Sequence, residues 1–302
     1  MKMMSKSRRY SLKDVLFDLF NYTIIILFAI SCLYPFYYIF LYSISDSVEA
    51  ARGAVVLWPV KPDFSTYKQL LLSPDIAHAA FISISRTVIG TLISVLCSGY
   101  FAYLLTRQDL PFRKIIYRFT IFTMYVSAGL IPWYMLMMKL GLKNNFLLYV
   151  LPGAIQAFNI ILVKTYIEQI PRSLEESAML DGAGNFTLFF RIVFPVSLPI
   201  FATIAVFCAV SQWNTWQDNF YLVNNRNLMT LQFLLLKYMN SLIAIGMSQK
   251  ASLMSVASRA KSISPISIQM TMAMITVLPV LLVYPIMQRY FIKGIMIGAI
   301  KG

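Results

Sequence analysis

Six stretches of this chain run for 20 or more residues without a charged side chain, and they constrain the fold more than any other feature. They are Leu19–Ser45, Thr87–Thr106, Phe119–Met138, Asn144–Val163, Ile192–Gln217 and Ser262–Gln288. A helix rises about 1.5 Å per residue, so roughly 20 apolar residues cross a bilayer core of about 30 Å. Because lipid offers the backbone no hydrogen bonds, such runs form helices. We therefore expect an all-α membrane protein with six transmembrane helices.

The composition agrees with this expectation. Apolar and aromatic residues make up 59% of the 302 residues and charged residues 13%, whereas soluble domains carry about a quarter charged residues. These values exclude a disordered chain, a disulfide-stapled secreted module and an ordinary soluble enzyme. The net charge of +14 does not indicate a nucleic-acid partner, because the cations fall between apolar runs and not on one soluble face.

The distribution of lysine and arginine predicts the orientation, since cytoplasmic segments of membrane proteins carry an excess of both. With a cytoplasmic N-terminus, fifteen of the 26 cations lie inside: Lys2, Lys6, Arg8, Arg9, Lys13, Arg107, Arg113, Lys114, Arg118, Lys164, Arg172, Arg191, Arg289, Lys293 and Lys301. Ten lie outside, and Arg86 lies near the start of the second run. We expect both termini in the cytoplasm, with residues 1–18 as an amphipathic cytoplasmic segment and residues 19–302 as the six-helix transmembrane domain.

Catalytic signatures are missing from the sequence. It has no H-E-x-x-H, G-x-S-x-G or Cys-x-x-Cys motif, and no Gly-Lys pair that could form a P-loop. The three cysteines are too far apart for a metal motif and are interpreted as small apolar packing residues. The predicted spans hold no carboxylate, which disfavours a proton-coupled carrier. We therefore expect no catalytic residue and no metal site, and any uphill transport would need energy from another subunit.

The segment between the fourth and fifth runs carries the most informative pattern. Ser173 is expected to cap a helix, with Glu176 completing a capping box. That helix would run to about Leu180 and break at Gly182, since glycine tolerates a left-handed turn. A second short helix, Asn185–Ile192, would follow. The pattern alone is equally compatible with an interfacial amphipathic loop helix.

This segment resembles the coupling motif of binding-protein-dependent ABC importer permeases, E-A-A followed four residues later by G and then by I-x-x-P. The matching residues are Glu176, Ser177 (where alanine is usual), Ala178, Gly182, Ile192 and Pro195. Two further elements, Val126–Pro132 and Trp213-Asn214-Thr215-Trp216, are similar to those of carbohydrate-importer permeases of the maltose type, the MalG family. The C-terminal pieces Tyr284-Pro285, Gln288–Gly294 and Gly298–Gly302 are similar to its LplC/YtcP-like branch. The resemblance extends from about Asp14 to Gly302.

The resemblance implies the type I permease fold of ABC importers and a coupling helix at about residues 173–190. Residues with this coupling role would be Glu175, Glu176, Ser177, Ala178, Asp181, Gly182 and Ala183. The implied partners are a second permease in a heterodimer, two copies of a cytoplasmic ABC ATPase, an extracytoplasmic sugar-binding protein, an oligosaccharide and the lipid bilayer of a bacterial cell membrane. The chain itself would bind no cofactor, because the partner ATPase uses ATP and Mg.

A sugar pathway needs aromatic rings beside amide side chains, because sugars offer both C–H faces and hydroxyls. The segment Ile192–Phe220 supplies Gln212, Trp213, Asn214, Trp216, Gln217, Asp218 and Asn219, and the fourth run supplies Gln156 and Asn159 on one helix face. Helix–helix hydrogen bonding, or a place in the interfacial belt for the tryptophans, is the alternative. Two long outer loops, from Asp46 to about Ala80 and from Asp218 to about Lys261, would dock the binding protein.

Three other functions stay open from the sequence. The same machinery could carry another solute, such as an amino acid or a peptide, although the sugar-type elements weigh against it. A self-contained channel or secondary carrier and an intramembrane enzyme are disfavoured by the missing intramembrane carboxylates and catalytic motifs.

Overall fold

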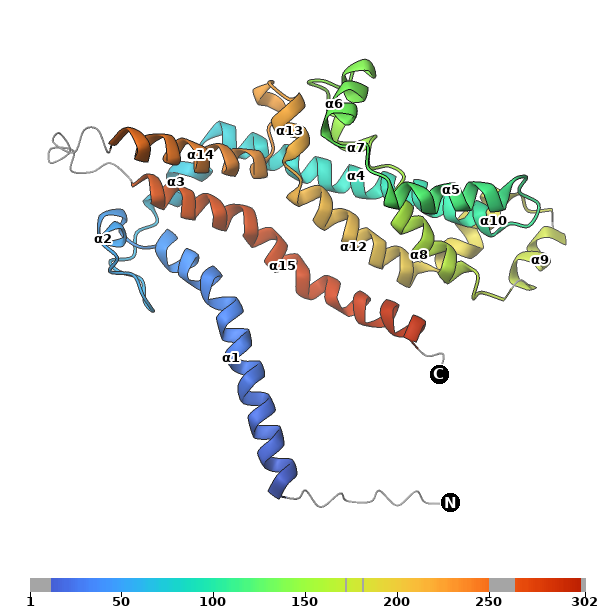
Figure 1. Cartoon of the computed structure of the whole chain (residues 1–302), viewed down its shortest axis with the longest axis horizontal. Helices are drawn as coiled ribbons and strands as arrows, with labels where there is room; N and C mark the ends of the chain where they lie inside the picture. The colour runs from blue at the N-terminus through green and yellow to red at the C-terminus, as the bar shows by residue number, and fades with distance from the viewer. Residues whose placement is uncertain (1–11, 172, 181, 250–263, 300–302) are drawn as a thin grey trace. The chain divides into compact units, whose positions relative to one another are not determined.

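The computed structural model describes residues 12–171, 173–180, 182–249 and 264–299. It divides into two compact units, residues 1–68 with 252–274 and residues 69–251 with 275–302. The described residues form helices joined by loops and contain no β-strand, only an isolated bridge between Ser45 and Pro62 (Figure 1). The expected all-α architecture is therefore confirmed.

The first unit contains α1, Leu12–Ser43, which covers the first apolar run. Its side chains are exposed along most of its length, and burial begins only at Leu41. The short helix α2, Ser47–Ala51, follows, with the Asp46 carboxylate accepting hydrogen bonds from the first-turn N–H groups of Val48 and Glu49. The chain continues into α3, Ser65–Leu71. The cap and the small core at this end fix the turn that leaves α1.

The second unit is built along α4, Pro74–Thr106. A helix of 33 residues is about 50 Å long. Helices α8, Ala157–Ile167, and α12, Leu198–Asn214, pack along it (Figure 1). The helix begins 13 residues before the apolar run that predicted it, since Pro74 is well suited to a first turn.

Two of the predicted spans are bent. The third run forms α5, Arg113–Tyr125, and α6, Leu130–Lys139, which meet at 120°. Gly129 precedes α6 with a φ of +82°, a conformation that favours glycine. The fifth run belongs to a second bent pair, in which the segment Asn185–Val196 meets α12 at 87°.

The fourth run is not one helix. It forms α7, Leu147–Val150, and then α8, separated by a loop that contains Pro152 and Gly153. Proline lacks the N–H that a helix interior needs, and glycine adds backbone freedom, so the pair interrupts the helix. The chain continues after α12 through α13, Gln217–Leu222, a short turn η2, Arg226–Leu228, and α14, Leu231–Gln249. The last helix is α15, Pro265–Ala299.

Three described helical segments are long and apolar enough to span a membrane: Leu12–Ser43, Pro74–Thr106 and Ile266–Pro285. The number rises to five if each bent pair forms one span. The count of six spans and the cytoplasmic position of both termini stay predictions. Residues 1–11 of the expected amphipathic segment, and residues 300–302, lie outside the described residues.

Candidate functional site

The predicted coupling segment forms a helix, a turn and a second short helix. Helix α9 spans Ser173–Leu180, and the chain then turns through Gly182, whose φ is +81°. The turn is closed by the N–H of Ala183, which donates to the carbonyl of Ala178 at 3.0 Å. A side chain at Gly182 would have open space around it, so the left-handed backbone is what requires glycine there. The predicted end of the helix and the turn are confirmed.

Other details of this segment differ from the expectation. Ser173 is the first helical residue and not the cap, and its carbonyl accepts a hydrogen bond from the Ser177 hydroxyl at 2.9 Å. The second helix is shorter than Asn185–Ile192: α10 covers Asn185–Leu188, and a π-helical turn, Phe189–Val193, continues it. One residue of the predicted coupling set, Asp181, lies outside the described residues.

The coupling segment has one exposed face and one packed face. Glu176 and Ser177 are exposed, and so are the apolar side chains of Leu180 at 90% and Phe186 at 64%, although the Phe186 ring also contacts that of Tyr100 in α4. Ala178 and Ala183 instead pack against the hydrophobic core of the second unit. A mixed apolar and charged exposed surface on a firmly attached helix is typical of a protein-docking site.

Phe189 attaches the segment to the long helices. Its side chain is fully buried, and its ring centroid lies 5.2 Å from that of Tyr100 in α4 and 6.0 Å from that of Phe201 in α12. Edge-to-face ring contacts of this kind add to the free energy gained from burial. The coupling segment is therefore anchored to both α4 and α12 through its aromatic core.

A charged contact supports the same attachment. Arg107, the residue directly after α4, donates a hydrogen bond from its guanidinium to the Glu175 carboxylate at 3.2 Å. It also donates to Asp109 at 3.1 Å, and this bond lowers the pKa of the Asp109 carboxyl below its ordinary value. A hollow of about 490 Å³ opens beside the pair, lined by Thr106, Arg107, Gln108, Asp109, Ile167, Glu168, Ile170, Glu175, Glu176 and Met179.

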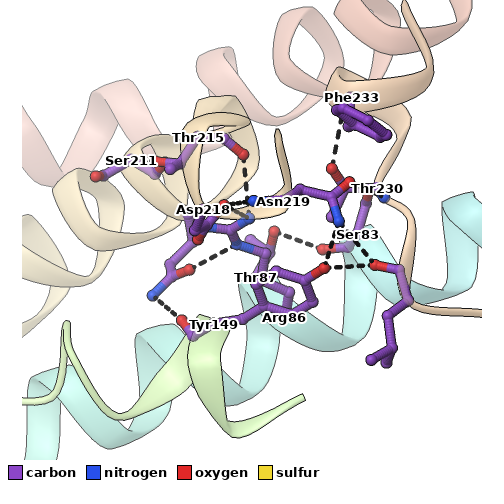
Figure 2. Close-up of polar contacts among 12 residues, drawn as sticks. Ser83, Arg86, Thr87, Tyr149, Ser211, Thr215, Asp218, Asn219, Thr230 and Phe233 are labelled. Carbon is purple, nitrogen blue, oxygen red and sulfur yellow. Dashed lines mark hydrogen bonds and ion pairs between the residues drawn. The ribbon is translucent and has the colours of Figure 1, made fainter. Parts of the chain in front are cut away.

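A second charged group lies farther along α4, inside the protein. Arg86 is 3% exposed, and its guanidinium forms an ion pair with Asp218 of α13 at 2.6 Å. It also donates to the Gln212 side chain at 3.0 Å and to the backbone carbonyl of Thr215 at 3.1 Å. The ring of Tyr149 lies 4.6 Å from the guanidinium carbon, within range of a cation–π contact. Figure 2 shows Arg86 lying beside Tyr149, Thr215 and Asp218.

Asn219 extends this group of polar contacts. Its amide donates to the Tyr149 hydroxyl at 2.8 Å, and its side-chain oxygen accepts from the backbone N–H of Thr230 at 3.2 Å (Figure 2). The Ser83 hydroxyl of α4 accepts from the N–H of Leu231 at 2.9 Å. We call Arg86, Tyr149, Gln212, Asp218 and Asn219 the Arg86 cluster. It ties α4, α7, α12, α13 and the start of α14 together.

The sequence interpretation named Gln212, Asp218 and Asn219 as pathway residues and did not connect them with Arg86 or Tyr149. The usable signal was Arg86 itself, a charge directly before an uninterrupted apolar run, because ionisable residues in membrane helices are costly and need a partner. Its partner Asp218 lies 132 residues away in the sequence, so no local pattern connects them.

Several predicted pathway residues make internal hydrogen bonds. Asn159, buried at 1% exposure, donates to the Cys208 sulfur at 3.1 Å and to the side-chain Oε1 of Gln156 at 3.3 Å. Trp213 donates from its indole N–H to the backbone carbonyl of Thr276 in α15 at 3.0 Å. With the bonds of Gln212 and Asp218 described above, these contacts correspond to the helix–helix bonding that was the alternative for this set.

The remaining pathway residues line a hollow, and one of them, Asn214, also accepts a hydrogen bond from the Gln232 side chain at 3.1 Å. Asn214, Trp216 and Gln217 lie where α12 ends and α13 begins. They contribute to a hollow of about 420 Å³ lined by Phe207, Val210, Ser211, Asn214, Thr215, Trp216 and Gln217. An aromatic ring beside amide and hydroxyl groups is the lining that a sugar-binding surface needs. A pathway role for this subset stays a prediction.

The cysteines and the single histidine have no shared site. Cys208 is buried, whereas Cys32 and Cys97 are exposed. His78 contacts the backbone carbonyl of Asn227 through Nε2 at 2.7 Å. Within residues whose placement is described, no group of three or more His, Cys, Asp or Glu side chains could hold a metal ion.

Comparisons with known proteins agree with this geometry. Residues 90–216 match the family described as binding-protein-dependent transport system inner membrane component. The chain is 35% identical to the polygalacturonan/rhamnogalacturonan transport system permease protein YtcP of Bacillus subtilis, over 96% of this chain and all of that protein. It is 32% identical to the protein LplC of the same organism, over 89% of each chain.

A solved structure is also similar. A chain from the crystal structure of a bacterial ABC transporter involved in the import of the acidic polysaccharide alginate matches with a TM-score of 0.82 and 32% identity. The match covers 94% of this chain and all of that one. The resemblance inferred from the motifs, and the membrane location that it implies, are confirmed. This chain is a member of the binding-protein-dependent transport system inner membrane components, the membrane permeases of bacterial ABC importers.

Proposed function

We propose that this chain is a permease subunit of an ATP-driven importer for oligosaccharides. The observation that carries the proposal is the coupling segment, residues 173–190. It exposes the Glu176 carboxylate and the apolar side chains of Leu180 and Phe186, while Phe189 anchors it on α4 and α12. Such a segment can receive a push from a docked protein and pass it to the transmembrane helices.

The docked protein would be a cytoplasmic ABC ATPase, in two copies. ATP and Mg would be used there, since the permease sequence has no P-loop and binds no cofactor in this proposal. Glu175, Glu176, Ser177, Ala178, Asp181, Gly182 and Ala183 would form the permease side of the contact. A second permease would complete the pathway, and an extracytoplasmic binding protein would deliver the solute to the outer loops.

The solute class rests on two kinds of support. The hollow beside Asn214, Trp216 and Gln217 has the lining that sugars need. The similar permease YtcP is named for polygalacturonan and rhamnogalacturonan transport, and the similar solved transporter imports alginate. These glycans carry carboxylates, so oligosaccharides of uronic acids are the first substrates to test.

The test is reconstitution of the complete transporter in proteoliposomes, with uptake of labelled oligogalacturonides measured with and without ATP. We expect uptake only when ATP, the ATPase and the binding protein are all present. A neutral oligosaccharide of equal length serves as the matched control for the acidic substrate.

The alternatives predict different results. Solute flux by this chain alone, driven by a gradient, would establish a channel or secondary carrier and refute the proposal. ATP-dependent uptake of peptides or amino acids without uptake of any oligosaccharide would retain the importer and reject the sugar assignment. Chemical conversion of a solute by the purified chain would instead indicate an intramembrane enzyme.

A further inference from the structure

We propose that Arg107 is a positioning residue that makes the coupling helix α9 move together with α4, through its ion pair with Glu175. The proposal rests on the coupling role proposed for α9 and adds the contact that transmits the motion. Arg107 follows the last residue of α4, and Glu175 lies in the first turn of α9, so the pair joins two elements 68 residues apart in the sequence.

The arginine is itself held in place. Its guanidinium is shared between Glu175 and Asp109, and it approaches the Met179 sulfur to 3.6 Å, one turn farther along α9. Arg113 donates to the carbonyl of Thr106 at 3.1 Å, which fixes the last turn of α4 from the other side. A guanidinium bound to two positions on the same short helix resists both sliding and rotation of that helix.

The Arg107–Glu175 pair is only partly buried. The Arg107 and Glu175 side chains are 15% and 16% exposed, and they line the 490 Å³ hollow beside α9. Partial burial protects the attraction from screening by salt, while the hollow leaves room for the two groups to separate and meet again. The fold of α9 does not depend on the pair alone, because Ala178, Ala183 and Phe189 also attach the segment.

A displacement of α9 can be transmitted along the continuous helix α4. From Arg107 back to Arg86, α4 covers about 31 Å at 1.5 Å per residue. Along this length α12 packs closely against it: a Cβ added at Gly99 would lie 2.3 Å from the Phe201 ring, and one at Gly90 would lie 2.6 Å from the Gln212 amide. The Arg86 cluster then fixes α13. A displacement of α9 therefore reaches the hollow at Asn214, Trp216 and Gln217 through α4 as well as through the chain itself.

The experiment measures solute imported per ATP hydrolysed by the complete reconstituted transporter. We expect R107Q and E175Q each to lower this ratio by about tenfold, within the usual range of coupling between two sites, while ATP hydrolysis stays within about twofold of the wild type. The charge swap R107E/E175R should restore most of the ratio, because it re-forms the pair with its partners exchanged.

A control variant separates the pair from its surroundings. E168Q removes a carboxylate that lines the same hollow but is bound to Lys164. This variant should keep the wild-type ratio. If R107Q does not assemble with the ATPase, E175Q and the charge swap still test the pair, since they retain either the arginine or both charges.

The proposal is overturned if both single variants keep the wild-type ratio, or if they lower it and the charge swap does not restore it. A purely structural role would reduce uptake and ATP hydrolysis together, with a lower melting temperature, and would also reject the proposal. Failure of the proposed function is distinguishable, because the wild-type transporter would then show no ATP-dependent uptake at all.

Discussion

Two arginines, Arg86 within α4 and Arg107 directly after it, bind carboxylates of distant segments, and their surroundings differ. The Arg86 and Asp218 side chains are 3% and 10% exposed. Arg86 also contacts the Gln212 side chain and the Tyr149 ring. The Arg107 and Glu175 side chains are 15% and 16% exposed beside a hollow. An arginine and a carboxylate therefore form a buried ion pair at Arg86 and a partly exposed ion pair at Arg107.

The physical reason is the cost of removing charge from water. A buried ion pair is stable only when its remaining donors and acceptors are also satisfied, and removing one partner then leaves an uncompensated charge. A partly exposed pair keeps access to water and loses less when it opens. The Arg86 cluster is accordingly expected to govern stability, and the Arg107 pair to govern coupling.

The largest loss of stability should come from breaking the buried Arg86–Asp218 ion pair. Arg86→Leu leaves the Asp218 carboxylate buried without its cation, which costs about 3–5 kcal/mol of stability. The melting temperature of the detergent-solubilised protein measures this loss. The double variant Arg86→Leu/Asp218→Leu should recover much of it, because no charge then stays buried. An unchanged melting temperature in the single variant would contradict this prediction, because it would mean that Asp218 reaches water when Arg86 is absent.

A smaller loss of stability is expected from a change at Gly99, which lies in α4 between Arg86 and Arg107. Gly99→Ala forces a methyl group against the Phe201 ring, and overpacking of this kind costs about 1–3 kcal/mol. Gly153→Ala is the matched control, because its added Cβ only approaches the Gln212 amide at 3.4 Å. Thermal unfolding of the two variants side by side tests the contact. Equal melting temperatures would mean that α4 and α12 separate easily.

The next effect separates coupling from stability. Gly182→Val places a β-branched residue at a φ of +81°, a strain of roughly 1–2 kcal/mol or more. Uptake should be lost because the altered turn changes the orientation of α9, while the protein stays in the membrane. Gly184→Ala should keep uptake, since Gly184 has an ordinary φ and open space. Membrane fractionation with an uptake assay gives both readings, and normal uptake by Gly182→Val would contradict the role of the turn.

The smallest effect should come from an ion pair one helical turn apart near the coupling segment. Glu168→Gln removes the carboxylate that Lys164 contacts at 2.7 Å, and the Glu168 side chain is 46% exposed. Helix pairs at this spacing contribute only about 0.3–0.5 kcal/mol. Both melting temperature and uptake should therefore stay close to the wild type. A large loss of uptake would show that the coupling contact extends beyond Arg107 and Glu175.

Local patterns predicted the coupling segment well. The end of α9 and the turn at Gly182 follow from residues within one or two turns of each other, so the sequence carries the needed information. The interruption of the fourth run at Pro152 and Gly153 was also readable, but the count of uncharged residues concealed it. Counting charges measures the length of an apolar run, whereas the backbone chemistry of proline and glycine decides whether that run is one helix.

The candidate pathway was less predictable. Gln212 and Trp213 are neighbours in sequence, yet one belongs to the Arg86 cluster and the other bonds to α15. A glutamine or tryptophan side chain in an apolar helix serves equally well for a ligand or for a neighbouring helix. Only the packing of α4, α7, α12 and α15 shows which of these polar groups are already occupied and which face a hollow.

Composition and residues close together in the chain were enough to predict the all-helical membrane architecture, the family motifs and the turn that follows the coupling helix. The bends of the helices and the pairing of the polar side chains, including the two different ion pairs of Arg86 and Arg107, became visible only in the packed structure. Contacts between residues 68 and 132 positions apart depend on how the whole chain packs, and burial then sets what each contact contributes.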